Sequence, residues 1–345
     1  MAQRYLVTGG AGFVGSHLVA ALLDRNDHCT VADNFQTGHR AAVLPGARLV
    51  TLDLHDAAAV DALVSDGPWD AVFHFASRSL VAESMREPYR YFSENLNTAL
   101  RLIEACVHHG VRRFVLSSTA ALFGSPTSMP IDEDYPILPH SPYGESKWMI
   151  ERALHWADSI HGLRSACLRY FNAAGADPAG RLGEHHDPET HLIPLVIDAA
   201  LGRRPELLIF GNDYATPDGT CIRDYVHVTD LAAAHLLAVE RLDGGSVRYN
   251  LGTGTGHSVQ DVIRAVEHVS GRTVPTRLVA RRHGDPAALV ADSTRMRRET
   301  GWQPRFAALD EMVATALAWR IANPAGYASG PAEPAISAAK LANPS

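Results

Sequence analysis

A tyrosine and a lysine that could together move a proton stand four residues apart, in Tyr143-Gly-Glu-Ser-Lys147. In a helix this spacing is about one turn, so both side chains project from one face. A free phenol has a pKa of about 10 and is a poor base at neutral pH, but a neighbouring cation stabilises the phenolate and makes it a usable proton acceptor. Chance places Tyr-x-x-x-Lys in many proteins, so the pair gains its meaning from the rest of the chain.

A glycine-rich segment, residues 8–15, lies between an expected strand and an expected helix. Gly9, Gly12 and Gly15 let the backbone come close to a pyrophosphate, and the helix N-terminus offers unpaired N–H groups. The next strand ends at Asp33, whose carboxylate can accept hydrogen bonds from a ribose 2′-hydroxyl and would repel a 2′-phosphate. These positions predict NAD rather than NADP. A tight turn without a ligand, and a turn cap at Asp33, are the structural alternatives.

Three hydroxyl residues, Ser117-Ser118-Thr119, end another expected strand. A doubly wound sheet binds its ligands at that edge, and a hydroxyl there can hydrogen-bond the oxygen that gains or loses a proton during hydride transfer. Alone, the segment would be interpreted as an ordinary Ser/Thr loop. Together with Tyr143 and Lys147 it predicts a catalytic group of three residues that includes Thr119.

Short apolar strands alternate with longer helical patterns through the first half of the chain. The expected strands are 5–7, 29–31, 49–52, 71–75, 114–116 and 166–169, and the expected helices are 15–25, 57–64, 91–108 and 143–161. This alternation predicts right-handed βαβ crossovers and a parallel sheet with helices on both faces. The predicted fold class is therefore α/β, a doubly wound (Rossmann) sheet.

Beyond about residue 180, prolines punctuate shorter segments, which indicates a smaller C-terminal α/β lobe for the substrate. We expect residues 1–180 to form the NAD-binding domain and residues 181–327 the smaller lobe, with a segment near 247–251 returning to the main sheet. Residues 328–345, rich in Ala, Pro and Ser, are expected to form a flexible tail.

Composition narrows the classes of function. The 345 residues have a net charge of −7 and no basic run, so no nucleic-acid partner is expected. The four cysteines lack C-x-x-C spacing, which argues against a zinc site or a disulfide framework, and no metal is expected. No apolar run has the length of a membrane span, and the strand-like start leaves no room for a signal peptide. We expect a soluble, cytoplasmic protein with no membrane partner.

The glycine segment, Thr119, Tyr143 and Lys147 have the order and spacing of the extended short-chain dehydrogenase/reductase family, which the chain resembles from about residue 4 to residue 327. Within that family, four longer segments are similar to the UDP-glucose 4-epimerase group, namely 169–175, 210–214, 218–230 and 249–252. The resemblance implies an isomerase with tightly bound NAD. In it Tyr143 takes the proton of the sugar 4-hydroxyl while C4 gives up a hydride, and the 4-keto sugar receives the hydride on its other face. Lys147 would hold the nicotinamide ribose and lower the tyrosine pKa, and Thr119 would bridge to the sugar hydroxyl.

The resemblance also implies contacts to both ligands. The implied cofactor contacts are Gly9, Gly12, Phe13, Val14, Gly15, Asp33, Asn34, Asp53, Leu54, Phe75, Ala76, Ser79, Asn95, Tyr143, Lys147 and Phe171. The implied UDP-sugar contacts are Thr119, Asn172, His191, Leu192, Leu208, Phe210, Arg223, Arg282, Asp285 and Leu289. Without the family, Phe75 and Phe171 would be interpreted as core aromatics and each arginine as a surface charge.

A homodimer through the helices 91–108 and 143–161 is implied as well. The apolar residues of these helices could face either a partner or the sheet, and the sequence does not separate the two uses; they are Leu96, Leu100, Ile103, Met149 and Leu154.

Three positions depart from the family pattern. Ser79 stands where many relatives carry a lysine near the pyrophosphate, and Arg78 or backbone N–H groups are the candidates to replace that charge. His191 stands where asparagine is frequent, and it keeps a hydrogen-bonding group. Leu289 stands where a tyrosine often closes the sugar pocket, so the pocket is either more permissive or suited to a pentose.

Several functions compete on these residues. UDP-glucose/UDP-galactose is the favoured substrate pair, but 4-epimerisation of UDP-N-acetylglucosamine or of UDP-xylose/arabinose would use the same catalytic group. A dehydratase would follow the threonine with acidic residues, whereas Thr119 precedes Ala120-Ala121. A non-catalytic dinucleotide sensor would have no need of both Tyr143 and Lys147.

Overall fold

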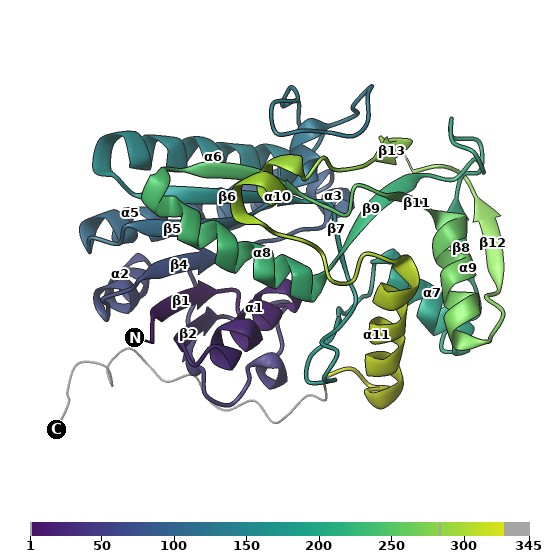
Figure 1. Ribbon diagram of the computed structural model, residues 1–345, viewed down its shortest axis with the longest axis horizontal. Helices are drawn as coiled ribbons and strands as arrows, with labels where there is room; N and C mark the ends of the chain where they lie inside the picture. The colour runs from purple at the N-terminus through teal and green to yellow at the C-terminus, as the bar shows by residue number, and fades with distance from the viewer. Residues whose placement is uncertain (1, 283, 328–345) are drawn as a thin grey trace.

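The computed structural model describes residues 2–282 and 284–327, and its main sheet has seven strands in the order β10-β6-β5-β4-β1-β2-β3 (Figure 1). All neighbouring strands of this sheet run parallel. The strand order reverses between β1 and β4, which opens the ligand crevice of a doubly wound fold at the carboxyl ends of the strands. The predicted fold class is confirmed. The strands are β1 (Arg4–Thr8), β2 (His28–Asp33), β3 (Arg48–Thr51), β4 (Ala71–His74), β5 (Arg113–Thr119), β6 (Arg164–Tyr170) and β10 (Val247–Leu251).

Helices cover both faces of this sheet. One face carries α1 (Phe13–Asp24) and α8 (Val228–Arg241), which pack on each other, and the other carries α2 (Ala57–Ser65), α5 (Thr98–His108) and α6 (Pro142–His161) (Figure 1). Successive residues of a strand point to opposite faces. Accordingly, Tyr5 and Val7 of β1 belong to the core beneath α1, while Leu6 belongs to the core that includes Leu154 of α6.

The single helix expected over residues 91–108 is wrong in detail. The chain forms α4 (Pro88–Tyr91), then a π-helical turn η2 (Phe92–Asn97), and only then α5. Such π-helical turns often occur at functional sites. Here the turn carries Asn95, which is fully buried and hydrogen-bonds outside its own helix.

The second lobe, on the right in Figure 1, packs α7 (Leu192–Ala200), α9 (Val259–Ser270) and α11 (Leu309–Ala322) around an apolar core of its own. β8 (Leu207–Phe210) pairs with β12 (Thr276–Val279), and β9 (Ile222–His227) pairs with β7 (Asn172–Ala174), β11 (Gly256–Ser258) and β13 (Ala288–Leu289). The two lobes together also contain shorter helices, namely η1 (Arg40–Ala42), α3 (Val81–Ser84), η3 (Ala120–Phe123), η4 (Leu242–Gly244) and α10 (Thr294–Thr300).

The two lobes alternate along the chain. After β9 the chain returns to the main sheet through α8 and β10, and then leaves it again for β11 and α9. The segment expected near 247–251 is thus β10, beside β6. The division of the chain at residues 180 and 181 stays a prediction, and the expected tail, 328–345, lies outside the described residues. No helix among the described residues is long and apolar enough to cross a membrane.

Candidate active site

Helix α6 fixes the catalytic side chains in its first turns. It begins after Ser141, whose hydroxyl accepts the N–H of Gly144 at 3.2 Å, with proline as the first helical residue. A serine cap followed by proline is a strong helix start, so the position of Tyr143 is set locally. Tyr143, Lys147 and Glu151 then follow at four-residue spacing on one buried face of the helix.

Lys147 is anchored at the ends of two neighbouring strands. Its Nζ donates to Ser77 Oγ and to the Ser117 carbonyl oxygen, each at 2.9 Å. Burial lowers the pKa of the ammonium to about 7, and the charge of Glu151 opposes that shift. These bonds hold the Lys147 ammonium one helical turn from Tyr143, and its charge is supported by a carboxylate one turn further along the helix.

Tyr143 is buried beside Thr119, as expected. Burial raises the pKa of the phenol, and the Thr119 hydroxyl opposes this rise. The Thr119 oxygen also accepts the N–H of Ala121 at 3.1 Å and so caps η3, which fixes the direction of the side chain. An accepted bond uses a lone pair, so the Thr119 hydroxyl proton can be donated to the Tyr143 oxygen or, in its place, to a substrate oxygen. The structure therefore brings all three predicted catalytic residues together.

Glu151 was not singled out from the sequence, yet it is the centre of a buried network. Both of its oxygens accept from Arg169, Nε to Oε1 at 3.0 Å and Nη2 to Oε2 at 2.6 Å. Ser118 Oγ donates to Oε1 at 2.6 Å. The side chains of Arg169 and Glu151 are 0% and 2% exposed, so this is a fully desolvated ion pair. The four-residue spacing from Tyr143 and Lys147 was the one signal that could have identified Glu151.

The glycine turn fits a dinucleotide. Gly9 has φ +73°, and a Cβ there would lie 2.4 Å from the Ala76 nitrogen, which only glycine avoids. A Cβ on Gly15 would lie 2.3 Å from the Gly9 carbonyl oxygen, so these two glycines hold the turn against the sheet and the helix. Gly12 is the N-cap of α1, where a Cβ would come no closer than 3.4 Å to the chain. It leaves the helix N-terminus, with Phe13 and Val14, open to an anion.

The Asp33 carboxylate also stabilises the glycine turn and the turn that follows β2. Oδ2 accepts the N–H of Ala11 at 3.0 Å and Oδ1 accepts the N–H of Phe35 at 2.8 Å. Burial raises the pKa of this carboxyl, and these backbone bonds oppose the rise. Each oxygen retains a lone pair, so the predicted role toward a ribose hydroxyl and the turn-cap alternative are compatible.

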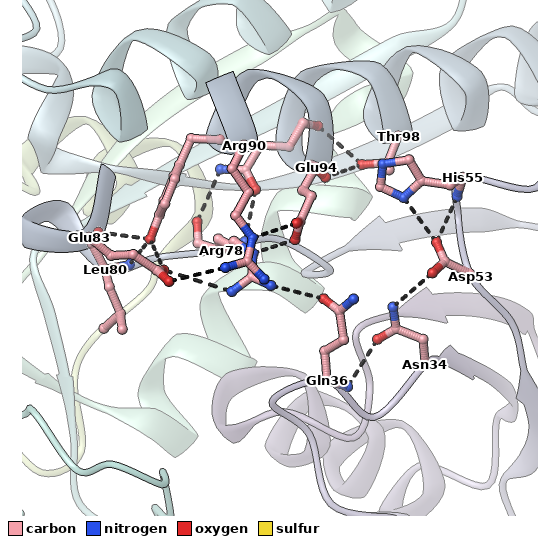
Figure 2. A network of polar contacts seen from close by, with 12 residues as sticks. Asn34, Gln36, Asp53, His55, Arg78, Leu80, Glu83, Arg90, Glu94 and Thr98 are labelled. Atoms are coloured by element: carbon pink, nitrogen blue, oxygen red, sulfur yellow. Dashed lines mark hydrogen bonds and ion pairs between the residues drawn. The ribbon is translucent and has the colours of Figure 1, made fainter. Parts of the chain in front are cut away.

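The remaining cofactor positions surround the same crevice. Asn34 Nδ2 lies 3.5 Å from Asp53 Oδ2, and Asp53 Oδ1 accepts the N–H of His55 (Figure 2). The side chain of Leu54 is buried in the core under α2 and α5, which leaves its backbone as the polar group at that position. The Phe75 ring packs in a tilted arrangement against His235 of α8, with ring centroids 4.9 Å apart, as a core aromatic would.

Arg78, which precedes Ser79 in the sequence, lies in a charge-balanced network (Figure 2). Its Nε donates to Glu94, its Nη1 is 3.7 Å from Glu83 Oε2, and its Nη2 reaches Gln36 at 3.4 Å. Arg90 contacts the same two carboxylates. Two arginines are thus matched by two glutamates, which argues against Arg78 as a spare cation for a pyrophosphate and leaves the backbone N–H groups near Ser79.

Asn95 ties this loop to the catalytic helix. Its side chain accepts the Arg78 N–H at 2.8 Å, donates to the Arg78 carbonyl at 3.0 Å and donates to Ser146 Oγ of α6 at 3.2 Å. Asn95 therefore shapes the loop that carries Phe75, Ala76 and Ser79 at the cofactor crevice.

The predicted substrate residues gather around β9 and β13. Arg223 Nη2 is 2.5 Å from Asp285 Oδ1, and its Nη1 donates to the Pro286 carbonyl at 2.9 Å. The Asn172 side chain donates to the Asp224 carbonyl at 3.0 Å. Leu289 is the register partner of Arg223, and it packs with Phe171 on the small apolar cluster that contains Ala120. Since Ala120 follows Thr119, this cluster connects the substrate lobe with the catalytic edge.

Two further groups belong to the substrate lobe. Leu207 and Ile209 of β8 point into its core, so Leu208 and Phe210 share the other face of the strand, and the Arg282 guanidinium lies 3.9 Å from the Phe210 ring centre. His191 precedes α7 as its N-cap and Leu192 is the first helical residue, with the His191 imidazole against Glu184. The contact of each position with a nucleotide sugar stays a prediction.

A doubly wound sheet with a glycine-rich turn at β1 and a buried Tyr-Lys-Thr group at β5 and α6 defines an NAD(P)-dependent protein of the short-chain dehydrogenase/reductase class. The chain belongs to the NAD dependent epimerase/dehydratase family, whose sequence model matches residues 5–252.

Known members of the family are similar over almost the whole chain. The UDP-glucose 4-epimerase of Azospirillum brasilense is 49% identical over 92% of this chain and 91% of its own length. That of Halalkalibacterium halodurans is 46% identical over 94% of this chain and 97% of its own. The crystal structure of the UDP-glucose 4-epimerase from Brucella ovis in complex with NAD is 42% identical, with a TM-score of 0.89, and the match covers 92% of this chain and 98% of that one.

Proposed function

We propose that this chain is an isomerase that catalyses the NAD-dependent 4-epimerisation of a UDP-sugar, with UDP-glucose and UDP-galactose as the substrate pair. The observation that carries the proposal is the buried group of Thr119, Tyr143 and Lys147 at the open end of β5, followed by Ala120-Ala121 instead of acidic residues. This group can remove and return a proton but lacks the acid that elimination of water requires. The high identity to UDP-glucose 4-epimerases supports the same substrate class.

The chain's own residues divide the work. Tyr143, as phenolate, takes the proton of the sugar 4-hydroxyl and later gives it back, and Lys147 provides the charge that makes the phenolate accessible. Thr119 donates a hydrogen bond to the same sugar oxygen, and burial of the three residues excludes water from the reacting atoms. NAD, when bound, supplies the redox chemistry by accepting the sugar's C4 hydride and returning it.

Replacement of the base tests this assignment. We expect Tyr143→Phe to lower kcat for UDP-galactose by about 10²–10⁴-fold, the usual contribution of a general base, with little change in KM. Tyr89→Phe is the matched control, because the Tyr89 side chain is 85% exposed on α4. The purified wild-type protein should carry NAD and show no net redox change. A Tyr143→Phe enzyme within a few-fold of wild type would refute the role of Tyr143.

The choice among UDP-sugars depends on Leu289. A leucine in the cluster with Phe171 offers apolar surface and no hydroxyl donor, which favours acceptance of an N-acetyl group. We propose measurable turnover of UDP-N-acetylglucosamine in addition to UDP-glucose. Ratios of kcat/KM for UDP-glucose, UDP-N-acetylglucosamine and UDP-xylose, in wild type and Leu289→Tyr, test this. If the tyrosine variant keeps the wild-type ratios, Leu289 does not set the preference.

We also propose a homodimer through α5 and α6. Ile103 and Leu154 are buried in the sheet core, whereas Leu100, Met149 and Trp156 are exposed on these two neighbouring helices. A chain in water would gain by covering such an apolar surface. Light scattering should give a dimer mass for wild type and a monomer mass for Trp156→Glu, with Ile321→Glu, on the exposed side of α11, as the control. A dimeric Trp156→Glu protein would contradict this interface.

The domain division and the location complete the proposal. We assign NAD binding to residues 1–180 and the UDP-sugar to residues 181–327, apart from the returning α8 and β10. A cytoplasmic location is favoured by the four cysteines, all free thiols within the described part of the chain. Fractionation of cells that express the chain would test the location.

A further inference from the structure

Four residues that can each bind a transition metal lie together in the segment that leads into α7. Glu184, His186, Glu189 and His191 each offer one ligand atom, and these atoms lie within 4.8 Å of one another. His186 Nδ1 is 3.3 Å from Glu189 Oε1 and 3.6 Å from Glu184 Oε1, and His191 Nδ1 contacts the same Glu184 oxygen. Tetrahedral ligands bound to zinc at about 2.0–2.1 Å lie about 3.3 Å from one another. Small side-chain movements would therefore complete a coordination sphere.

Burial gives this group a need for positive charge. The side chains of Glu184 and Glu189 are only 5% and 9% exposed, so both carboxylates lie largely out of water, each beside an imidazole. Glu189 Oε2 is buried without a hydrogen-bond partner among the described residues. The nearby Arg320 Nη1 is 4.0 Å from that oxygen, but Arg320 already forms a two-pronged pair with Asp198. Protonated His186 and His191 can supply this charge, and a divalent cation bound by all four side chains would supply it with both imidazoles neutral.

The kind and number of ligands point to one metal and one role. Two imidazole nitrogens and two carboxylate oxygens suit zinc, whereas calcium and magnesium prefer oxygen ligands alone. Four protein ligands close the coordination sphere, which is typical of a structural rather than a catalytic zinc site. The ligands occupy the spacing Glu-x-His-x-x-Glu-x-His, a pattern missed by a search for paired cysteines.

The position of the group indicates what a metal would hold. His191 is the N-cap of α7, and Leu192 is its first residue. The other three ligands lie in the irregular segment between β7 and α7, which has no strand or helix of its own. A metal would fix this segment to the start of α7. Both His191 and Leu192 are proposed contacts of the nucleotide sugar.

We propose that Glu184, His186, Glu189 and His191 form a structural zinc site that holds the start of α7 in its substrate-binding position. The metal takes no part in proton or hydride transfer. The zinc site stands independently of the epimerase activity, and its effect on α7 rests on the proposed function.

Zinc affinity is the first test. The full chain without an affinity tag is stripped with a chelator, and zinc is titrated in competition with a chromophoric chelator. We expect one tight site per chain in wild type and in His268→Ala, which removes a largely exposed imidazole on α9. His186→Ala and Glu189→Gln should each weaken zinc binding by at least about 100-fold, since even the loss of an outer-shell partner costs 10–100-fold. Equal zinc affinity in all four proteins would overturn the site.

Two further measurements use the wild-type chain alone. Zinc should raise its Tm by several degrees, with reversal by chelator, because a metal that binds only the folded chain stabilises it. No shift in Tm would count against the site even if the variants did not fold. UDP binding, measured by calorimetry, should weaken several-fold in the stripped chain and recover with zinc. Equal UDP affinity with and without zinc would overturn the role at α7, whereas a zinc-loaded chain that does not bind UDP would overturn the proposed function instead.

Discussion

Glu151→Gln should destabilise the protein more than almost any other single charge removal. The glutamine retains the size of the side chain, but it leaves the Arg169 guanidinium, 0% exposed, without its counter-ion. Removal of one partner from a buried ion pair typically costs about 3–5 kcal/mol, because the remaining charge stays desolvated. The Ser118 hydroxyl loses its charged acceptor at the same time. We therefore expect the free energy of unfolding to fall by about 3–5 kcal/mol, a large part of the total for a typical domain.

Urea unfolding followed by tryptophan fluorescence measures this loss. Glu104→Gln is the matched control, because Glu104 is exposed on α5, and such surface changes stay within about 0.5 kcal/mol. The double variant Glu151→Leu/Arg169→Met should recover most of the stability, since a buried ion pair can often be exchanged for apolar residues of similar volume. A loss below about 1 kcal/mol for Glu151→Gln would refute the view that Arg169 depends on this carboxylate.

Three other perturbations follow from the same structure. For Lys147, burial lowers the pKa from 10.5 to about 7, so the unfolded chain holds a proton that the folded chain lacks between these pH values. The free energy of unfolding of wild type should thus rise with pH from about 7 to 10 relative to that of Lys147→Met. If urea titrations gave the two proteins parallel curves of this free energy against pH, the lowered pKa of Lys147 would be contradicted. For His235, burial lowers the pKa from 6.5 to about 4, and the wild-type stability should therefore fall as the pH drops from 6.5 to about 4. His235→Leu should flatten that slope in acid titrations, and an unchanged slope would argue that His235 is not buried in its neutral form. Arg78→Ala removes the link to Gln36 across the cofactor crevice and should speed NAD release by roughly threefold to tenfold, the effect of about 1 kcal/mol. Dialysis of the purified protein measures this release, the exposed Arg86→Ala serves as the control, and equal rates in the two variants would refute the role of Arg78.

Local sequence signals were sufficient for the parts of the site that one element carries. The four-residue spacing predicts that Tyr143 and Lys147 share one face of a helix, and the expected helix 143–161 is observed as α6 with both residues on its buried face. The glycine turn is also recognisable from the sequence, because Gly9 and Gly15 are required by close backbone approaches within or next to the turn.

Contacts between elements that are distant in sequence could not be predicted from such local signals. Lys147 donates to groups that follow β4 and end β5, and this depends on the order of strands in the sheet. The π-helical turn at Asn95 has no periodicity of its own, and it is stabilised by bonds to Arg78 and Ser146, which are distant in sequence. Leu289 reaches the cluster beside Thr119 only because β13 pairs with β9. Sequence also could not choose between Arg78 and backbone N–H groups at Ser79, because the two glutamates that balance the charge of Arg78 become its neighbours only in the fold.

The catalytic pair and the buried ion pair form one unit. Burial of Tyr143 raises the pKa of its phenol, which makes the phenolate harder to form. Burial of Lys147 lowers the pKa of its ammonium, the cation that should stabilise that phenolate. Neither residue could work in isolation, and the charge of Glu151 supports the protonated lysine. If that charge is removed, the pKa of Lys147 falls further, less of the cation exists at neutral pH, and the Tyr143 phenolate becomes harder to form. Glu151→Gln should therefore lower kcat at pH 7, while the stability-restoring Glu151→Leu/Arg169→Met variant should keep this catalytic defect. Recovery of both properties in the double variant would show that Glu151 acts through folding alone.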